Sequence, residues 1–93
     1  LERLHSSSEA LRNRKVLVVD DDARNIFALT SLLENHDMDV ISATNGRRAI
    51  EIIDETPDLS IVLMDIMMPE MDGYETMREI RRSPHHRTLP ILA

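Results

Sequence analysis

KVLVVD (residues 15–20) and LSIVLMD (residues 59–65) are the two stretches that decide the fold. Each is a short apolar run that ends in an aspartate, Asp20 in the first and Asp65 in the second. Near-continuous apolar runs of this length are typical of strands that are buried on both faces of a parallel sheet. Because the carboxyl ends of parallel strands meet at one edge of a sheet, we expect the two aspartates to lie close together.

Helical patterns occupy the segments between these runs. Asp22 can cap a helix over residues 23–35, and the apolar residues of that helix share one stripe. The stripe consists of Ile26, Leu29 and Leu33, with Leu32 alongside. The remaining elements follow from similar signals: a strand over 38–43, a helix from Asn45-Gly46 to Pro57, a helix from Gly73 to Ser83-Pro84, and a strand in LPILA at 89–93. The order β-α-β-α-β-α-β predicts an α/β fold with a doubly wound parallel sheet.

Length and composition indicate one small domain. The chain has 93 residues, of which 42% are hydrophobic, and it has no cysteine for a disulfide or a thiolate metal site. The longest apolar runs are about five residues, against the ~20 that a membrane-spanning helix needs. We therefore expect a cytoplasmic segment without membrane contact, whether or not the parent protein is anchored in a membrane.

The charge of the chain argues against nucleic-acid binding. Seventeen acidic residues against eleven Lys and Arg give a formal net charge of −6, which repels a phosphate backbone. Aromatic residues make up only 2% of the chain, so the stacking platforms of single-strand binders are also lacking. We expect no direct contact with nucleic acid.

Residues 1–14 differ from the rest of the chain. They are mostly polar, and three serines follow one another at 6–8. The leucines at 1, 4 and 11 match part of a heptad, so the segment is either a solvated linker or the end of an upstream helix. The domain itself is predicted over residues 15–93.

Three carboxylates are expected at the carboxyl edge of the sheet: Asp20, Asp21 and Asp65. Carboxylates that lie so close repel one another unless a cation lies between them. Oxygen ligands suit a hard ion, which indicates Mg²⁺, with Mn²⁺ as a substitute. A carboxylate in such a centre can attack phosphorus and form an acyl phosphate, and Asp65 is the candidate nucleophile. Asp22 is better explained as a helix cap.

Two motifs carry a family resemblance: VLVVDDD at 16–22 and VLMDIMMPEMDG at 62–73. The chain resembles the flavodoxin-like receiver domains of response regulators and hybrid histidine kinases. The resemblance implies a sheet with strand order 2-1-3-4, phosphorylation of Asp65, and metal binding by Asp20, Asp21 and Asp65. It also implies a metal contact from the backbone carbonyl of Met67.

The resemblance further implies a partial receiver, truncated after strand four. The strand-five lysine, the switch Ser or Thr and the last helices of the family have no counterpart before Ala93. Their absence would leave apolar surface beside the first helix, which we expect a dimer or a swapped assembly to bury. The parent protein is expected to be a hybrid histidine kinase or a multi-receiver protein.

The leading functional hypothesis is a phosphorelay module. It takes a phosphoryl group from the phosphohistidine of a histidine kinase or phosphotransfer domain onto Asp65 and slowly hydrolyses it, so it is a switch more than an enzyme. One alternative is a haloacid-dehalogenase-like phosphatase, whose D-x-D nucleophile motif Asp20 and Asp22 match in spacing. The other is a receiver-like interaction module that is never phosphorylated.

Overall fold

The computed structural model describes residues 12–65, 73–82 and 89–92. Strands and helices alternate along these residues in the predicted order. The elements are β1 (Lys15–Val19), α2 (Ala23–Glu34), β2 (Asp39–Ala43), α3 (Gly46–Glu55), β3 (Leu59–Met64), α4 (Gly73–Arg82) and β4 (Ile91–Leu92). Among the described residues, no helix combines the length and apolar character needed to cross a bilayer.

The described strands form one parallel sheet in the order β2-β1-β3-β4. The two apolar runs, β1 and β3, are direct neighbours in it, with Val19 opposite Met64. The predicted doubly wound sheet with strand order 2-1-3-4 is therefore confirmed. Since every strand points the same way, the residues that follow β1 and β3 emerge at the same edge of the sheet.

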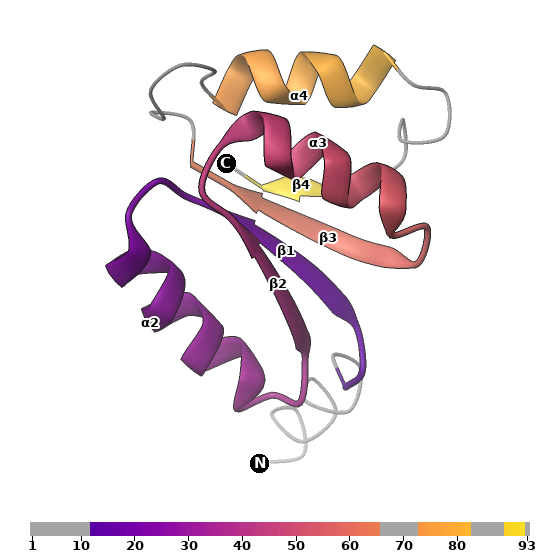
Figure 1. The fold of residues 1–93 in the computed structure, drawn as a ribbon. Helices are drawn as coiled ribbons and strands as arrows, with labels where there is room; N and C mark the ends of the chain where they lie inside the picture. Colours follow the sequence, from indigo (N-terminus) through magenta and orange to yellow (C-terminus); the bar gives the residue numbers. More distant parts are fainter. Residues whose placement is uncertain (1–11, 66–72, 83–88, 93) are drawn as a thin grey trace.

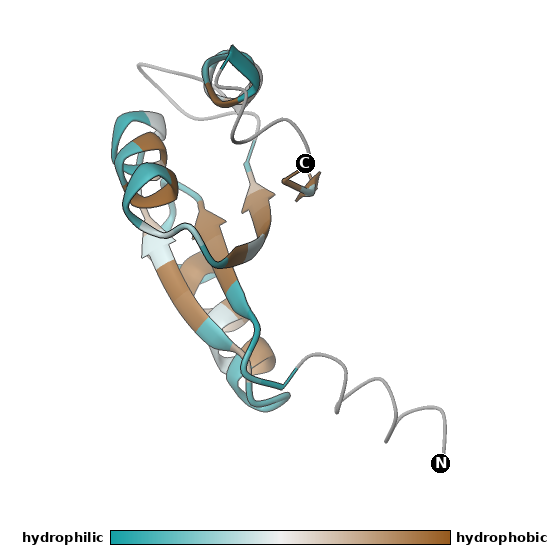
Figure 2. Ribbon diagram, turned by 90° about the vertical axis from the view of Figure 1, so that its right-hand side faces the viewer, coloured by the Kyte–Doolittle hydropathy of each residue, from teal (hydrophilic) through white to brown (hydrophobic). Residues whose placement is uncertain are grey.

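The main core lies between the sheet and the pair α3 and α4, which pack against each other (Figure 1). Side chains alternate between the two faces of a strand, so every second residue of β1 and β3 enters this core. Its buried members are Leu17, Val19, Ala43, Ala49, Ile52, Ile53, Val62, Met64 and Ile80. Figure 2 shows the strands as the hydrophobic part of the fold, while most of α4 is hydrophilic.

Helix α2 contacts β2 and β1 and lies apart from α3 and α4 (Figure 1). Its stripe residues Ile26, Leu29 and Leu33 are only half-buried. Leu32 is 55% exposed and does not share this burial, because it lies on the flank of the helix. Leu92 of β4 is also 55% exposed, so apolar surface remains on this side of the sheet.

Among the element boundaries that differ from the predictions, two have clear local reasons. Helix α2 ends at Glu34, because Asp37 adopts a φ of 59° and the N–H of Met38 turns back to the carbonyl of Leu33 at 3.2 Å. Strand β4 begins only at Ile91, since Pro90 before it has no N–H to donate to a ladder. Its carbonyl instead accepts from the N–H of Val62 at 2.9 Å. Ser83-Pro84 and Ala93 lie outside the described residues.

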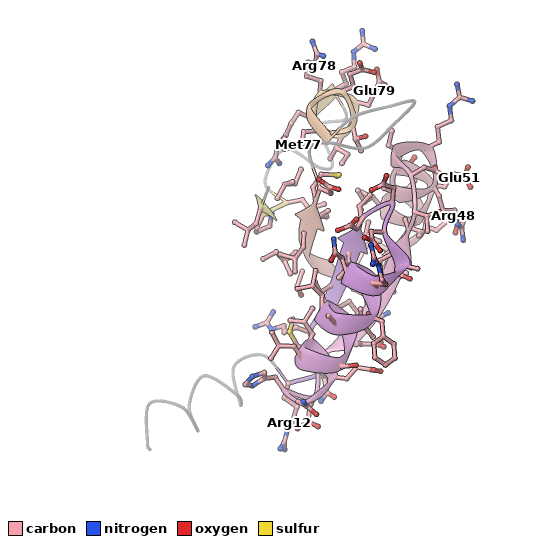
Figure 3. The ribbon with its side chains drawn as sticks, turned by 90° about the vertical axis from the view of Figure 1, so that its left-hand side faces the viewer. Arg12, Arg48, Glu51, Met77, Arg78 and Glu79 are labelled. Atoms are coloured by element: carbon pink, nitrogen blue, oxygen red, sulfur yellow. The ribbon has the colours of Figure 1, made fainter. Side chains whose placement is uncertain are left out.

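An ion pair and backbone hydrogen bonds hold the start of β1, at the edge of the sheet opposite the carboxyl ends of the strands. Arg12 forms an ion pair with Asp37 at 3.4 Å, and the N–H of Asn13 donates to the carbonyl of Asp37 at 2.9 Å. The carbonyl of Arg14 accepts from the N–H of Asp39 at 2.9 Å. Figure 3 shows Arg12 at the end of the molecule opposite Met77 of α4. Of the predicted linker, only residues 12–14 are described.

Candidate metal centre

Asp20 and Asp65 each occupy the position directly after a buried strand, and backbone hydrogen bonds hold both there. The N–H of Asp20 donates to the carbonyl of Ala43 at 3.1 Å. The N–H of Asp65 donates to the carbonyl of Val19 at 2.8 Å, so the end of β3 is tied to the end of β1. The sheet itself therefore brings the two aspartates to one place.

Three carboxylates converge at this edge. One oxygen from each of Asp20, Asp21 and Asp65 lies within 4.8 Å of the other two. Asp20 is 7% exposed, Asp65 is half-buried and Asp21 is exposed. The structure thus brings together the three predicted side chains. Their exposure to solvent increases from Asp20 through Asp65 to Asp21. Met67, whose carbonyl was predicted as a fourth ligand, lies outside the described residues.

Asp20 is held at both of its carboxylate oxygens. Its Oδ1 accepts from the backbone N–H of Asp22 at 2.9 Å, and its Oδ2 accepts from Nδ2 of Asn25 at 3.2 Å. The sequence patterns gave Asn25 no role, since it falls outside the apolar stripe of α2. Helical side chains lean toward the N-terminus of their helix. An amide in the first turn after an acidic strand end is the signal that could have identified it.

Asp22 turns away from the cluster, as predicted for a helix cap. Its Oδ1 accepts from the backbone N–H of Arg24 at 2.9 Å, and its carboxylate pairs with the Arg24 guanidinium at 3.1 Å. The side-chain hydrogen bond from Arg24 lowers the pKa of Asp22 below its ordinary value. With this carboxylate committed to α2, the structure gives no support to a D-x-D centre built from Asp20 and Asp22.

The donor set fits a small hard cation. All three side chains offer carboxylate oxygens, the ligands that Mg²⁺ and Ca²⁺ prefer in proteins. Opposite ligands of an octahedral Mg²⁺ lie about 4.2 Å apart, twice the Mg–O distance. The span of 4.8 Å in the protein is only slightly larger. A cation here would also offset the mutual repulsion of three negative charges.

The acidic cluster opens into a cleft of about 350 Å³. Its polar end is formed by Asp20, Asn25 and Asp65. The rest of its lining is apolar and comes from α2, β1, β3 and β4: Val18, Val19, Leu29, Leu63, Met64 and Leu92. Asp65 therefore lines the same cleft as Leu29 of α2 and Leu92 of β4.

Comparison with known proteins gives a consistent result. The family model described as a response regulator receiver domain matches residues 16–93. The two-component response regulator ORR7 of Oryza sativa subsp. japonica is 32% identical over 77 residues, or 83% of this chain and 37% of the relative. Histidine kinase 3 of Arabidopsis thaliana is 39% identical over 71 residues, or 76% of this chain and 7% of the relative.

The fold is also found in solved structures. The N-terminal domain of a response regulator receiver protein from Methanoculleus marisnigri JR1 has a TM-score of 0.78 and is 36% identical. The match covers 83% of this chain and 62% of that one. The flavodoxin-like arrangement predicted from the motifs is thus shared with an experimental structure. This chain spans less than two thirds of the length of each of these three proteins.

Proposed function

The chain belongs to the family of response regulator receiver domains, and from this premise we propose that Asp65 is the phosphoacceptor of a two-component phosphorelay. The observation that supports this role is the convergence of Asp20, Asp21 and Asp65 within 4.8 Å at the carboxyl edge of the sheet. Asp65 is half-buried and lines an open cleft, so a phosphoryl donor can reach it.

The proposed cofactor is Mg²⁺, with Mn²⁺ as a substitute. Asp20, Asp21 and Asp65 would hold the ion, and the family motif adds the backbone carbonyl of Met67. When bound, the ion supplies positive charge that neutralises the oxygens of the transferring phosphoryl group. The protein's own contribution is to fix the carboxylates in place before the donor arrives, which lowers the ordering cost of the reaction.

The proposed reaction is a phosphoryl transfer from a phosphohistidine. An oxygen of the Asp65 carboxylate attacks phosphorus and forms an O–P bond while the N–P bond of the donor breaks. The electron pair of the broken bond stays on the imidazole nitrogen of the donor. Water later attacks the phosphorus of the aspartyl phosphate, which releases inorganic phosphate and restores the carboxylate. The module is thus a switch that resets itself.

The proposed partners are a histidine kinase or a phosphotransfer domain in the cytoplasm. One relative of this chain is itself named a histidine kinase, which supports a hybrid kinase as the parent protein. The exposed Leu32 and Leu92 favour a further contact, in a dimer or swapped assembly. Direct contact with nucleic acid stays disfavoured by the net charge of −6.

The acceptor can be identified by peptide mapping. The protein is incubated with Mg²⁺ and acetyl phosphate, reduced with borohydride to convert an aspartyl phosphate into homoserine, and digested with trypsin. Cleavage at Lys and Arg places Asp20 in peptide 16–24 and Asp65 in peptide 49–78. Modification of peptide 49–78 that is lost in Asp65→Asn supports the proposal.

The other outcomes distinguish the alternative functions. Modification of peptide 16–24 would support a phosphatase-like nucleophile at Asp20. If the protein binds neither beryllofluoride nor Mg²⁺ and neither peptide is modified, the interaction module is the correct function. Asp39→Asn is the matched control, because Asp39 is exposed at the start of β2, at the opposite edge of the sheet.

A further inference from the structure

Among the residues that the structure describes, Asn25 holds Asp20 through a side-chain hydrogen bond. The backbone of Asp20 is fixed by its own N–H, which donates to Ala43, and Oδ1 is held by the N–H of Asp22. The freedom that remains is rotation of the carboxylate about its Cβ–Cγ bond. The bond from Nδ2 of Asn25 to Oδ2, 3.2 Å long, restrains that rotation by holding the second oxygen.

The position of Asn25 suits this task. It lies in the first turn of α2, it is exposed, and it lines the same cleft as Asp20 and Asp65. Its amide carries no charge, so it restrains Asp20 without changing the electrostatic balance of the cluster. The amide therefore affects the geometry of a carboxylate that is 7% exposed more than it affects the local potential.

We propose that Asn25 is a positioning residue that makes the acidic centre select Mg²⁺ over Ca²⁺, an inference that rests on the proposed function because the three carboxylates must hold an ion. Mg²⁺ demands near-ideal octahedral geometry at short distance, whereas Ca²⁺ accepts six to eight oxygens and often takes both oxygens of a carboxylate. A carboxylate whose plane is restrained favours the octahedral geometry of Mg²⁺. A carboxylate that turns freely can offer both oxygens and favours Ca²⁺.

The difference between the two ions follows from which oxygens are held. With Asn25 in place, both oxygens of Asp20 accept a hydrogen bond, so rotation into a two-oxygen contact breaks two bonds, one from Asn25 and one from Asp22. Without Asn25, that rotation costs only the bond from Asp22. Partners that orient metal ligands typically change metal affinity 10- to 100-fold, and removal of this one should weaken Mg²⁺ by about 10-fold.

The test is direct titration of the protein with Mg²⁺ alone and with Ca²⁺ alone, by isothermal titration calorimetry. Asn25→Ala should weaken Mg²⁺ binding about 10-fold and Ca²⁺ binding clearly less, so that the Mg²⁺/Ca²⁺ affinity ratio falls. Ser31→Ala, at an exposed position of the same helix, should leave both affinities unchanged. Alanine favours helix formation at both positions, so neither variant is expected to unfold α2.

The results also distinguish this inference from the proposed function. If Asn25→Ala weakens the binding of both ions equally, or changes neither, the selectivity role is overturned. The proposed function still stands in that case if Asp65 of the wild type is phosphorylated. A wild-type protein that binds no Mg²⁺ overturns both. A lower Mg²⁺/Ca²⁺ ratio in Asn25→Ala together with normal binding in Ser31→Ala supports the inference.

Discussion

Removal of the charge on Asp65 should stabilise the fold when no divalent cation is present. Asp65 has two acidic neighbours, Asp20 and Asp21, and the three carboxylates have oxygens within 4.8 Å of one another. Asparagine keeps the shape of the side chain and one carbonyl oxygen but removes the repulsion. A substitution at a partly buried position usually destabilises a protein, so the expected sign is unusual.

The magnitude follows from Coulomb's law. At a separation of 4.8 Å, one pair of unit charges costs about 0.9 kcal/mol in a water-like dielectric of ~80 and about 3.5 kcal/mol in one of ~20. Asp21 is exposed and Asp65 half-buried, so the lower figure applies to that pair, and its use for the more buried Asp20 as well gives a minimum of about 2 kcal/mol for the two pairs. For a domain of this size, that corresponds to a rise in Tm of about 8–16 °C.

The assay is thermal unfolding followed by circular dichroism in low-salt buffer, with EDTA and then with Mg²⁺. In EDTA, Asp65→Asn should melt above the wild type, and added salt should narrow the difference because the charges are partly exposed. Mg²⁺ should raise the Tm of the wild type more than that of the variant, since an ion stabilises the state that binds it. A variant that melts below the wild type in EDTA, or a gain that Mg²⁺ does not reduce, would refute the electrostatic reasoning.

Four further predictions concern stability and association. Leu17→Ala, at a fully buried position of β1, should lower the free energy of unfolding in urea by about 2–5 kcal/mol. Asn45→Ala removes the cap that accepts from the N–H of Arg48 at 2.9 Å, and should cost about 1 kcal/mol by the same measurement. The side-chain hydrogen bond from Arg24 lowers the pKa of Asp22, so the stability that this bond contributes is present above the ordinary pKa of 3.8 and is lost as pH falls through the lower folded value. The urea midpoints of the wild type and Asp22→Asn should therefore converge below pH 3.8. Leu92→Ser should reduce the expected self-association, because Leu92 is exposed apolar surface. In sedimentation velocity, the sedimentation coefficient of the variant should depend less on protein concentration than that of the wild type.

The sheet could be predicted from sequence because its signals are local. The runs before Asp20 and Asp65 are apolar, short and bounded by polar residues, and strands alternating with helices allow few topologies. The convergence of the two aspartates then follows from parallel pairing alone. Asp22 was identified as a cap for the same reason, since capping depends on the few residues next to it.

The bond from Asn25 to Asp20 and the boundaries of β4 required the structure. Asn25 reaches Asp20 across a strand end, a loop and a helix turn, and no periodic pattern encodes that path. Strand β4 begins at Ile91 because Pro90 cannot donate, and its pairing depends on where β3 lies. The exposure of individual side chains could not be predicted from the apolar pattern either, since Leu32 and Leu33 are adjacent in sequence but differ in burial.

The ion pair between Arg12 and Asp37 holds the entry to β1 beside the turn between α2 and β2. Strand β1 is five residues long, so about 16 Å separates its entry from its acidic exit. Arg12 therefore lies at the end of the domain opposite the acidic cluster. Force applied to the chain before Arg12 would act first on the turn between α2 and β2, which contains Asp37, and only then on the acidic edge of the sheet.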